Sequence, residues 1–368
     1  MKNSTRRTQT VVAAVAVAVV AAIVGIAAGQ GSAAPAPGPE KPHPPKVEKF
    51  KHPKVKHGVL TVTGTQLDDT ITLRLQADHT DKLEVDVGDG SKDFRFDRKH
   101  ISKIEVDAES GDDSVLIDES NGVFTDAIPT TIEGGNGNDR LVGSSGAVTL
   151  RGGNGDDVIL GGAGAETLLG GNGNDSIDGN KGNDVGVMGN GDDTFVWDPG
   201  DGSDVVEGQN GTDRMLFNGA DGAEQVVLSA NGGRLRFFRD PGAVTMDTDD
   251  VETVDFNALG GADVVTLQDL SATDVRVVNL DLAATGGGGD GQPDRVVMNA
   301  TEGNDSIDVS GDASVVKVSG LAATLQILHP ESANDRLEVN TLGGADSVES
   351  GGLAPGAIQL FVDGAPRP

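Results

Sequence analysis

The chain of 368 residues contains no cysteine, no tyrosine and a single tryptophan, and aromatic residues make up only 3% of it. The absence of cysteine excludes disulfides and thiolate metal sites. Sites for sugars and for single-stranded nucleic acids usually stack their ligands on aromatic faces, which are scarce here. The composition therefore argues against both classes of ligand.

Several sequence motifs of enzymes are also missing. No two of the six histidines are four residues apart, so the sequence has no HExxH zinc site. It has no G-x-S-x-G nucleophile elbow and no Gly-Lys pair of a phosphate-binding loop. We therefore expect a protein that is not an enzyme.

Positive charge is scarce beyond the N-terminus. The formal net charge is −30, but residues 1–57 carry nine Lys or Arg against two acids, which leaves −37 for residues 58–368. Such an acidic body argues strongly against nucleic acid as a partner and favours cations.

Residues 1–34 have the pattern of a signal peptide, with Arg6 and Arg7 in a basic start and an apolar run over residues 11–28. The pattern predicts a secreted, extracellular protein. Because the run is just long enough to span a bilayer, an uncleaved anchor at the cell surface is the alternative. Residues 35–57 are rich in proline and lysine, which predicts an extended linker that could contact a cell-envelope polymer.

Glycine is abundant, and residues 134–196 repeat a nine-residue pattern seven times without a gap, as GGNGNDRLV, GSSGAVTLR, GGNGDDVIL, GGAGAETLL, GGNGNDSID, GNKGNDVGV and MGNGDDTFV. Glycine at positions one, two and four permits the positive φ of a tight turn, and Asn or Asp at positions three, five and six supplies oxygen. Positions seven to nine form a short strand with an apolar side chain at position eight. A short fixed period indicates stacked units that bury a shared core.

This pattern resembles the GGxGxDxUx nonapeptide of haemolysin-type, or repeats-in-toxin (RTX), calcium-binding proteins, and the layout of the chain is similar to that of secreted bacterial proteins of this type. The resemblance implies a parallel β-roll in which two nonapeptides make one turn. Units eighteen residues apart would then stack on the same edge.

With two units per turn, one edge carries G-N-G-[ND]-D in four successive turns, whereas the other has Val148, Glu166 and Asp184 at position six. Calcium takes six to eight oxygen ligands, and the turns offer nothing softer. We predict about three calcium ions on the first edge, one between each pair of turns, and poor or absent sites opposite. The predicted ligands are Asn136, Asn138, Asp139, Asn154, Asp156, Asp157, Asn172, Asn174, Asp175, Asn190, Asp192 and Asp193.

For Trp197 we predict a packing role. Beyond it the repeat resumes after a shift of two residues, and Asp204 and Asp213 then occupy position six. Asp184 and Asp204 are predicted to share one further calcium site, and Asp213 is another candidate ligand. Stacked carboxylates about 5 Å apart repel by roughly 3 kcal/mol at an effective dielectric constant near 20, so the ions are expected to be part of the fold. The alternative is a metal-free solenoid in which Gly, Asn and Asp only form turns.

The regions on either side of the repeats share a weaker pattern. Three pairs of strand-like segments carry acids at matched positions 44, 39 and 41 residues apart, which we interpret as three diverged β-rich units. The matched pairs are Asp69 with Asp113, Glu224 with Asp263, and Asp305 with Asp346. The predicted parts of the chain are a signal peptide (1–34), a linker (35–57), β unit 1 (58–133), the nonapeptide β-roll (134–216), β unit 2 (217–283) and β unit 3 (284–368).

The sequence thus predicts an all-β protein, with a central parallel β-roll, flanking solenoid-like β units and an N-terminal signal helix. Its predicted function is calcium binding coupled to folding outside the cell, in a structural or interaction role with an unknown protein partner. A surface adhesin and a carbohydrate-active or hydrolytic enzyme with an RTX module are the alternatives.

Overall fold

The computed structural model describes residues 49–90 and 92–367, and these are almost entirely β-structure with one 3₁₀ turn, η1 (Arg98–His100). By its contacts the chain separates into residues 1–47 and a compact unit of residues 48–368. No helix in the described part is long and apolar enough to cross a membrane. The predicted all-β fold is confirmed for this part. The predicted signal helix and most of the predicted linker lie outside the described residues.

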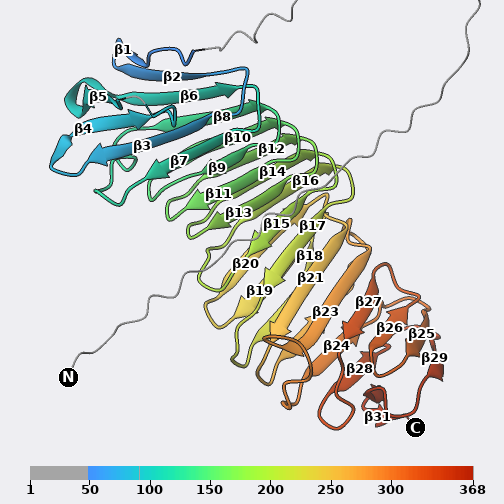
Figure 1. Cartoon of the computed structure of the whole chain (residues 1–368). Helices are drawn as coiled ribbons and strands as arrows, with labels where there is room; N and C mark the ends of the chain where they lie inside the picture. The colour runs from blue at the N-terminus through green and yellow to red at the C-terminus, as the bar shows by residue number, and fades with distance from the viewer. Residues whose placement is uncertain (1–48, 91, 368) are drawn as a thin grey trace, which may run out of the picture. The chain divides into compact units, whose positions relative to one another are not determined.

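Two large sheets, here called sheet A and sheet B, contain all the strands of the described residues (Figure 1). Sheet A has sixteen strands in the order β1 (Lys54–Lys56), β2 (Val59–Thr65), β6 (Lys103–Glu109), β8 (Thr130–Asn136), β10 (Val148–Asn154), β12 (Thr167–Asn172), β14 (Val185–Asn190), β16 (Val205–Asn210), β20 (Val244–Asp249), β19 (Arg234–Asp240), β18 (Gln225–Asn231), β22 (Val264–Leu267), β24 (Arg295–Asn299), β28 (Arg336–Asn340), β30 (Gln359–Val362) and β31 (Ala365–Pro366).

Sheet B has fifteen strands in the order β29 (Ser347–Leu353), β25 (Ser306–Gly311), β26 (Val315–Ser319), β27 (Thr324–Leu328), β23 (Val277–Ala284), β21 (Thr253–Leu259), β17 (Arg214–Asn218), β15 (Thr194–Trp197), β13 (Ser176–Asn180), β11 (Val158–Gly162), β9 (Arg140–Val142), β7 (Ser114–Asp118), β3 (Thr70–Gln76), β4 (His79–Asp86) and β5 (Phe94–Asp97). Both sheets continue through the predicted β units and the β-roll, whose boundaries stay predictions. β1 lies in the last residues of the predicted linker and pairs with β2.

In the repeat segment, successive nonapeptides alternate between the two sheets. β10 pairs in parallel with β12, which places Leu150 beside Leu168. β11 pairs with β13 in the same way, with Ile159 beside Ile177. Each partner lies eighteen residues along the chain, so the predicted parallel β-roll with two units per turn is confirmed.

The core lies between the two sheets, and in the repeat segment it is built mainly by the side chains at position eight. Gly186 is the exception in this series, and the structure shows why. A Cβ on Gly186 would lie 2.6 Å from Cε2 of Phe195, so the phenyl ring already fills that space. The fully buried members of the series are Leu141, Leu150, Ile159, Leu168, Ile177 and Phe195.

Trp197 ends β15 and is fully buried. Its ring stacks on Phe217 with centroids 3.9 Å apart and 6° between the planes, and Phe237 and Phe256 extend the cluster. The indole Nε1 donates to the carbonyl oxygen of Gly202 over 2.8 Å. The predicted packing role of Trp197 is therefore confirmed, and its fluorescence reports on the core beside the repeats.

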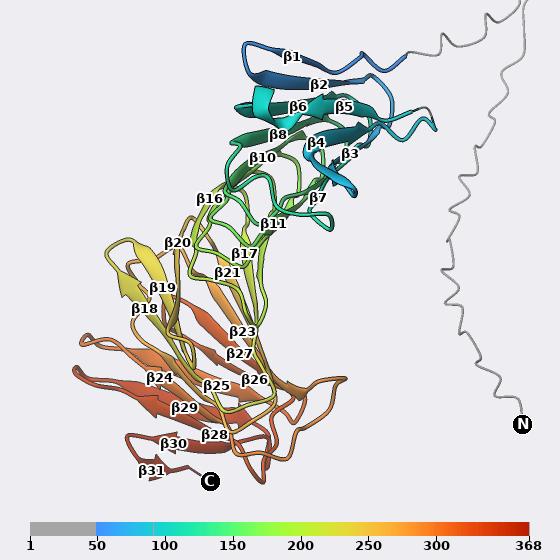
Figure 2. The same ribbon diagram turned by 90° about the vertical axis from the view of Figure 1, so that its left-hand side faces the viewer.

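Three antiparallel excursions interrupt the parallel stacking (Figure 2). They are β3–β4–β5, β18–β19–β20 and β25–β26–β27, and the first strand of each pairs in parallel with the next turn. At each of these places the backbone N–H of the first matched acid donates to Oδ1 of the second, over 2.7, 2.7 and 2.8 Å. The matched acids, which are 44, 39 and 41 residues apart, therefore lie on adjacent turns. That they mark three diverged β-rich units stays a prediction.

Candidate metal sites at the glycine-rich turns

A column of buried aspartates follows the turns that lead from sheet A to sheet B. Each of these residues directly precedes a strand of sheet B and is at most 2% exposed. The first-edge column, as we call this set, consists of Asp113, Asp139, Asp157, Asp175, Asp193 and Asp213.

Glycine is required in these turns, as the turn that ends at Asp157 shows. Gly153 and Gly155 both have a φ of +123°, which residues with a side chain rarely adopt. A Cβ on Gly152 would collide with Oδ2 of Asp157, and a Cβ on Gly155 would collide with the carbonyl oxygen of Gly137 in the adjacent turn. Positions one, two and four of the nonapeptide are therefore glycine because the carboxylate and the neighbouring turn leave no room for a side chain.

Hydrogen bonds engage one oxygen of each carboxylate in the column and leave the other without a partner. The backbone N–H of Asp139 donates to Oδ1 of Asp157 over 2.7 Å, and that of Asp157 donates to Oδ1 of Asp175 over 2.9 Å. The same bond recurs between the other neighbours in the column. Oδ2 is buried in all six residues and has no hydrogen-bond partner within residues 49–90 and 92–367. Since buried polar atoms are almost always paired, this row of oxygens indicates a site for positively charged ligands.

The side chains at positions three and five lie at the surface and form hydrogen bonds with the neighbouring turns. The amide of Asn154 donates to Oδ1 of Asn136 over 2.9 Å, and this amide ladder continues through three further turns. At position five, Oδ1 of Asn138 accepts the backbone N–H of Asp156 over 2.8 Å, and this bond also recurs. The position-six carboxylates, in contrast, are buried. The role of the predicted ligands at positions three and five stays a prediction.

Comparison with protein-family models adds independent evidence. Residues 133–165 and 160–195 match the model of the RTX calcium-binding nonapeptide repeat, which describes four copies. The chain carries an RTX repeat block. RTX repeats bind calcium, and the RTX block (residues 133–195) contains four members of the first-edge column. A search of curated proteins finds no match to the chain.

Calcium fits the groups that the turns of the RTX block present. Two oxygens lie close to the position that a Cβ on Gly152 would occupy. They are Oδ2 of Asp157 and the carbonyl oxygen of Gly170, which is 2.7 Å from that position. Carboxylate and carbonyl oxygens are the ligands that calcium prefers. The first-edge carboxylates would therefore hold the ion, which supplies the positive charge that their unpaired oxygens need.

Burial raises the pKa of the first-edge carboxyl groups because the ionised form loses its hydration. The pKa of Asp157 and of Asp175 is raised to about 7, and that of Asp139 to about 6. The negative charges of neighbouring turns raise the pKa of Asp157 and Asp175 further, whereas the backbone N–H donors lower it in part. In the metal-free form, Asp157 and Asp175 are therefore partly protonated near pH 7.

Without calcium, the protein is expected to be more stable at pH 5 than at pH 8. Asp157 and Asp175 have a folded-state pKa of about 7, against about 3.9 in an unfolded chain, so the folded state binds protons more tightly. Their contribution to stability is complete below about pH 4 and is lost as the pH rises through 7, by at most roughly 1.4 kcal/mol per group and pH unit. Thermal unfolding of calcium-free protein at the two pH values, followed by circular dichroism, measures the difference.

Millimolar calcium should reverse this order, because calcium binds the ionised carboxylates and competes with protons. A calcium-free protein with a higher Tm at pH 8 than at pH 5 would contradict the prediction.

The opposite edge, formed by the turns from sheet B to sheet A, carries a shorter column of acids. Glu166, Asp184 and Asp204 are each at most 2% exposed. The N–H of Glu166 donates to Oδ1 of Asp184 over 2.7 Å, and that of Asp184 to Oδ1 of Asp204 over 2.8 Å. One oxygen each of Glu166 and Asp184 is buried without a hydrogen-bond partner in the described part of the chain. The structure thus brings Asp184 and Asp204 together as predicted, and Glu166 joins them on an edge where the sequence predicts poor or absent sites.

Asp113 and Asp213 extend the first-edge column on either side of the RTX block. Asp213 is among the additional ligands predicted from the sequence, but Asp113 is not. The backbone N–H of Asp113 donates to Oδ1 of Asp139 over 2.8 Å, and burial raises its pKa to about 7. The signal in the sequence that could identify Asp113 is the spacing that matches it with Asp69, whose backbone N–H donates to Oδ1 of Asp113.

Proposed function

We propose that this is an exported calcium-binding protein whose folding is completed by calcium outside the cell, and that its role is structural or in interaction and not catalytic. The observation that carries the proposal is the first-edge column of buried carboxylate oxygens without hydrogen-bond donors. Such a column is destabilising where calcium is scarce, as in a cytoplasm, and becomes stabilising where calcium is plentiful. The signal-peptide pattern of residues 1–34 supports export.

We propose one calcium ion for each gap between neighbouring first-edge carboxylates. The six carboxylates from Asp113 to Asp213 enclose five gaps, whereas the nonapeptides alone predict about three ions. One further ion is proposed between Asp184 and Asp204 on the opposite edge. At ten times its dissociation constant each ion adds roughly 1.4 kcal/mol. Five ions would then add about 7 kcal/mol, a large share of the stability of an ordinary domain.

Calcium is therefore expected to raise the Tm of the protein by roughly 10 °C or more at pH 8. Differential scanning calorimetry in chelator and in millimolar calcium measures the shift, with magnesium at the same concentration as the control. Magnesium should have a much smaller effect, because it prefers an octahedral shell that keeps several waters. An unchanged Tm in calcium would refute the proposal.

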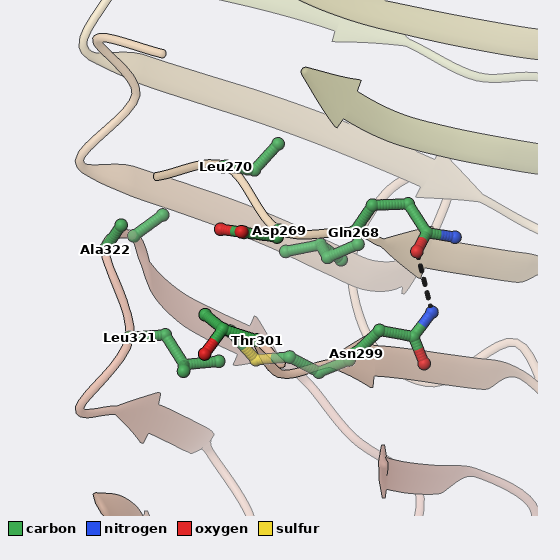
Figure 3. Close-up of a pocket in the computed structure, with 10 residues that line it drawn as sticks. Gln268, Asp269, Leu270, Asn299, Thr301, Leu321 and Ala322 are labelled. Atoms are coloured by element: carbon green, nitrogen blue, oxygen red, sulfur yellow. Dashed lines mark hydrogen bonds between the residues drawn. The ribbon is translucent and has the colours of Figure 1, made fainter. Parts of the chain in front are cut away.

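The hollow in Figure 3 bears on the enzymatic alternative. It lies beside the ends of β22 and β24, and Gln268 and Asn299 bond to each other at its rim over 3.0 Å. Its volume is about 10 Å³, which suits a single water. Asp269 is the only acid among the ten residues that line it, whereas hydrolysis of a glycosidic bond requires a pair. This hollow therefore gives no support to a hydrolytic enzyme.

A further inference from the structure

Positive charge is concentrated at one end of the described structure. Residues 49–103 carry eleven Lys or Arg against nine acids, whereas residues 104–368 carry twelve against 47. The first segment contains β1 and β5, the strands that end sheet A and sheet B on the N-terminal side (Figure 2). The basic end, as we call a set of five cations in this segment, consists of Lys54, Lys56, Arg98, Lys99 and Lys103.

The turn between β1 and β2 joins the elements that carry these cations. The carbonyl oxygen of Gly58 accepts the backbone N–H of Ser102 over 2.7 Å and that of Lys103 over 3.2 Å. These bonds hold the start of β6, which directly follows η1 and Ile101, against the end of β1. In the strand register Lys56 lies beside Val59, and Val59 lies beside Lys103. Lys56 and Lys103 therefore project from the same face of sheet A.

Most of these cations have no carboxylate partner. Lys103 forms an ion pair with Glu105 over 2.6 Å, and Arg98 donates to the carbonyl oxygen of Thr80 over 3.2 Å. By contrast, seven of the ten arginines in residues 104–368 form ion pairs with Asp or Glu. The lysines of the basic end without an ion pair in the described part of the chain are Lys54, Lys56 and Lys99.

Protection of a sheet edge explains only part of this surface. Lysines on an edge strand discourage pairing with another chain, and this reason covers the two lysines of β1. Arg98 and Lys99 lie in η1, which belongs to neither sheet, and they line an open hollow of about 460 Å³. The two acids of this hollow, Asp81 and Asp97, both already contact Lys82. Its arginine and lysine are thus available to a ligand.

The acids of the remaining chain do not cancel this charge at a distance. Sheet A has sixteen strands about 4.8 Å apart, so it extends for roughly 70 Å from β1. The Debye length at physiological ionic strength is about 8 Å, so most of these acids are screened from a ligand at the basic end. Calcium bound along the first-edge column would reduce their negative charge further.

We propose that the basic end binds a linear anionic polymer of the cell envelope through the phosphate or carboxylate groups of that polymer. Charge complementarity supports the class of partner, and the lysines of residues 35–51 add to the same charge. The basic end includes none of the large apolar side chains that are exposed in the described residues, which argues against insertion into a membrane. The proposal takes only export from the proposed function and does not depend on the calcium sites.

The test is binding of the full chain, in millimolar calcium, to fluorescent poly(glycerol phosphate) and to fluorescent poly(glutamate), measured by anisotropy at low and at high salt. Lys56→Gln with Arg98→Gln and Lys99→Gln is expected to bind at least tenfold more weakly than the wild type, with a shallower dependence on salt. The control variant has the same change of charge at exposed cations elsewhere and should bind as the wild type does. Its substitutions are Arg140→Gln, Lys181→Gln and Lys317→Gln.

Circular dichroism in calcium shows whether each variant is folded. If the first triple variant is not, Lys56→Gln with Lys99→Gln decides, with a severalfold weaker binding expected. Equal binding by the two triple variants, or no binding of the wild type to either polymer, overturns the inference. Tighter binding to phosphatidylglycerol vesicles than to both polymers also overturns it, in favour of a membrane surface. A wild type that ignores calcium but binds polymer through the basic end upholds this inference, and the proposed function then fails alone.

Discussion

Replacing Asp157 and Asp175 together by Asn is expected to make the protein more stable in chelator and to remove most of its response to calcium. Asn keeps Oδ1 as the acceptor for the N–H of the preceding turn. It replaces the buried, unpartnered Oδ2 by a neutral amide and so removes the repulsion between turns, roughly 3 kcal/mol for each neighbouring pair of charges. The same change takes a ligand from three of the five proposed gaps.

The measurement is the Tm of both proteins in chelator and in millimolar calcium at pH 8. We expect the calcium-induced rise in Tm to shrink by more than half in the variant. Asp156→Asn with Asp192→Asn is a matched control, because the change of charge is the same and position five is already Asn in other turns. This control should keep most of the calcium response. Equal losses in the two double variants would show that the charges at position five contribute to calcium binding as much as those at position six.

Substitution of Gly155 by Ala is expected to lower the free energy of unfolding by roughly 3 kcal/mol or more, with or without calcium. Its φ of +123° is strained for a residue with a side chain, and the added Cβ collides with the backbone carbonyl oxygen of Gly137. A backbone atom cannot move aside as a side chain does, so the two turns must separate. Their separation also widens the gap between Asp139 and Asp157, so calcium affinity should fall with stability.

Gly233→Ala is the control for this substitution. Gly233 lies between β18 and β19, has no positive φ, and a Cβ there meets nothing within 4 Å. Urea unfolding followed by Trp197 fluorescence should show a loss for Gly155→Ala and a change within about 0.5 kcal/mol for Gly233→Ala. Similar curves for the two variants would mean that adjacent turns are not packed as closely as the structure has them.

The register of the β-roll could be predicted from the sequence because three signals with the same nine-residue period agree. Glycine marks the turn, Asp marks its end and the apolar side chain at position eight marks the core. The matched acids outside the RTX block could also be identified from the sequence, since the three pairs keep similar spacing. In all three pairs the acids do lie on adjacent turns.

Other features could not be predicted from the sequence because they depend on contacts between distant segments. Within the excursion β18–β19–β20, Arg239 lies beside Glu224 and forms a buried ion pair with it. No local pattern in the sequence predicts this pair. The space that a side chain at Gly186 would occupy in the core is filled by the ring of Phe195 from the facing sheet. The amides at position three pair with the turn eighteen residues away, which only the stacked structure reveals.

The most direct test of calcium-coupled folding is a calcium titration followed by far-UV circular dichroism and Trp197 fluorescence. Trp197 packs at the end of the RTX block, so its emission reports whether the block and the adjoining core form together. The account predicts a cooperative gain of β signal together with a blue shift of the fluorescence, in the submillimolar to millimolar range typical of extracellular calcium modules. A chain that is fully folded in chelator at pH 8 and indifferent to calcium would contradict it.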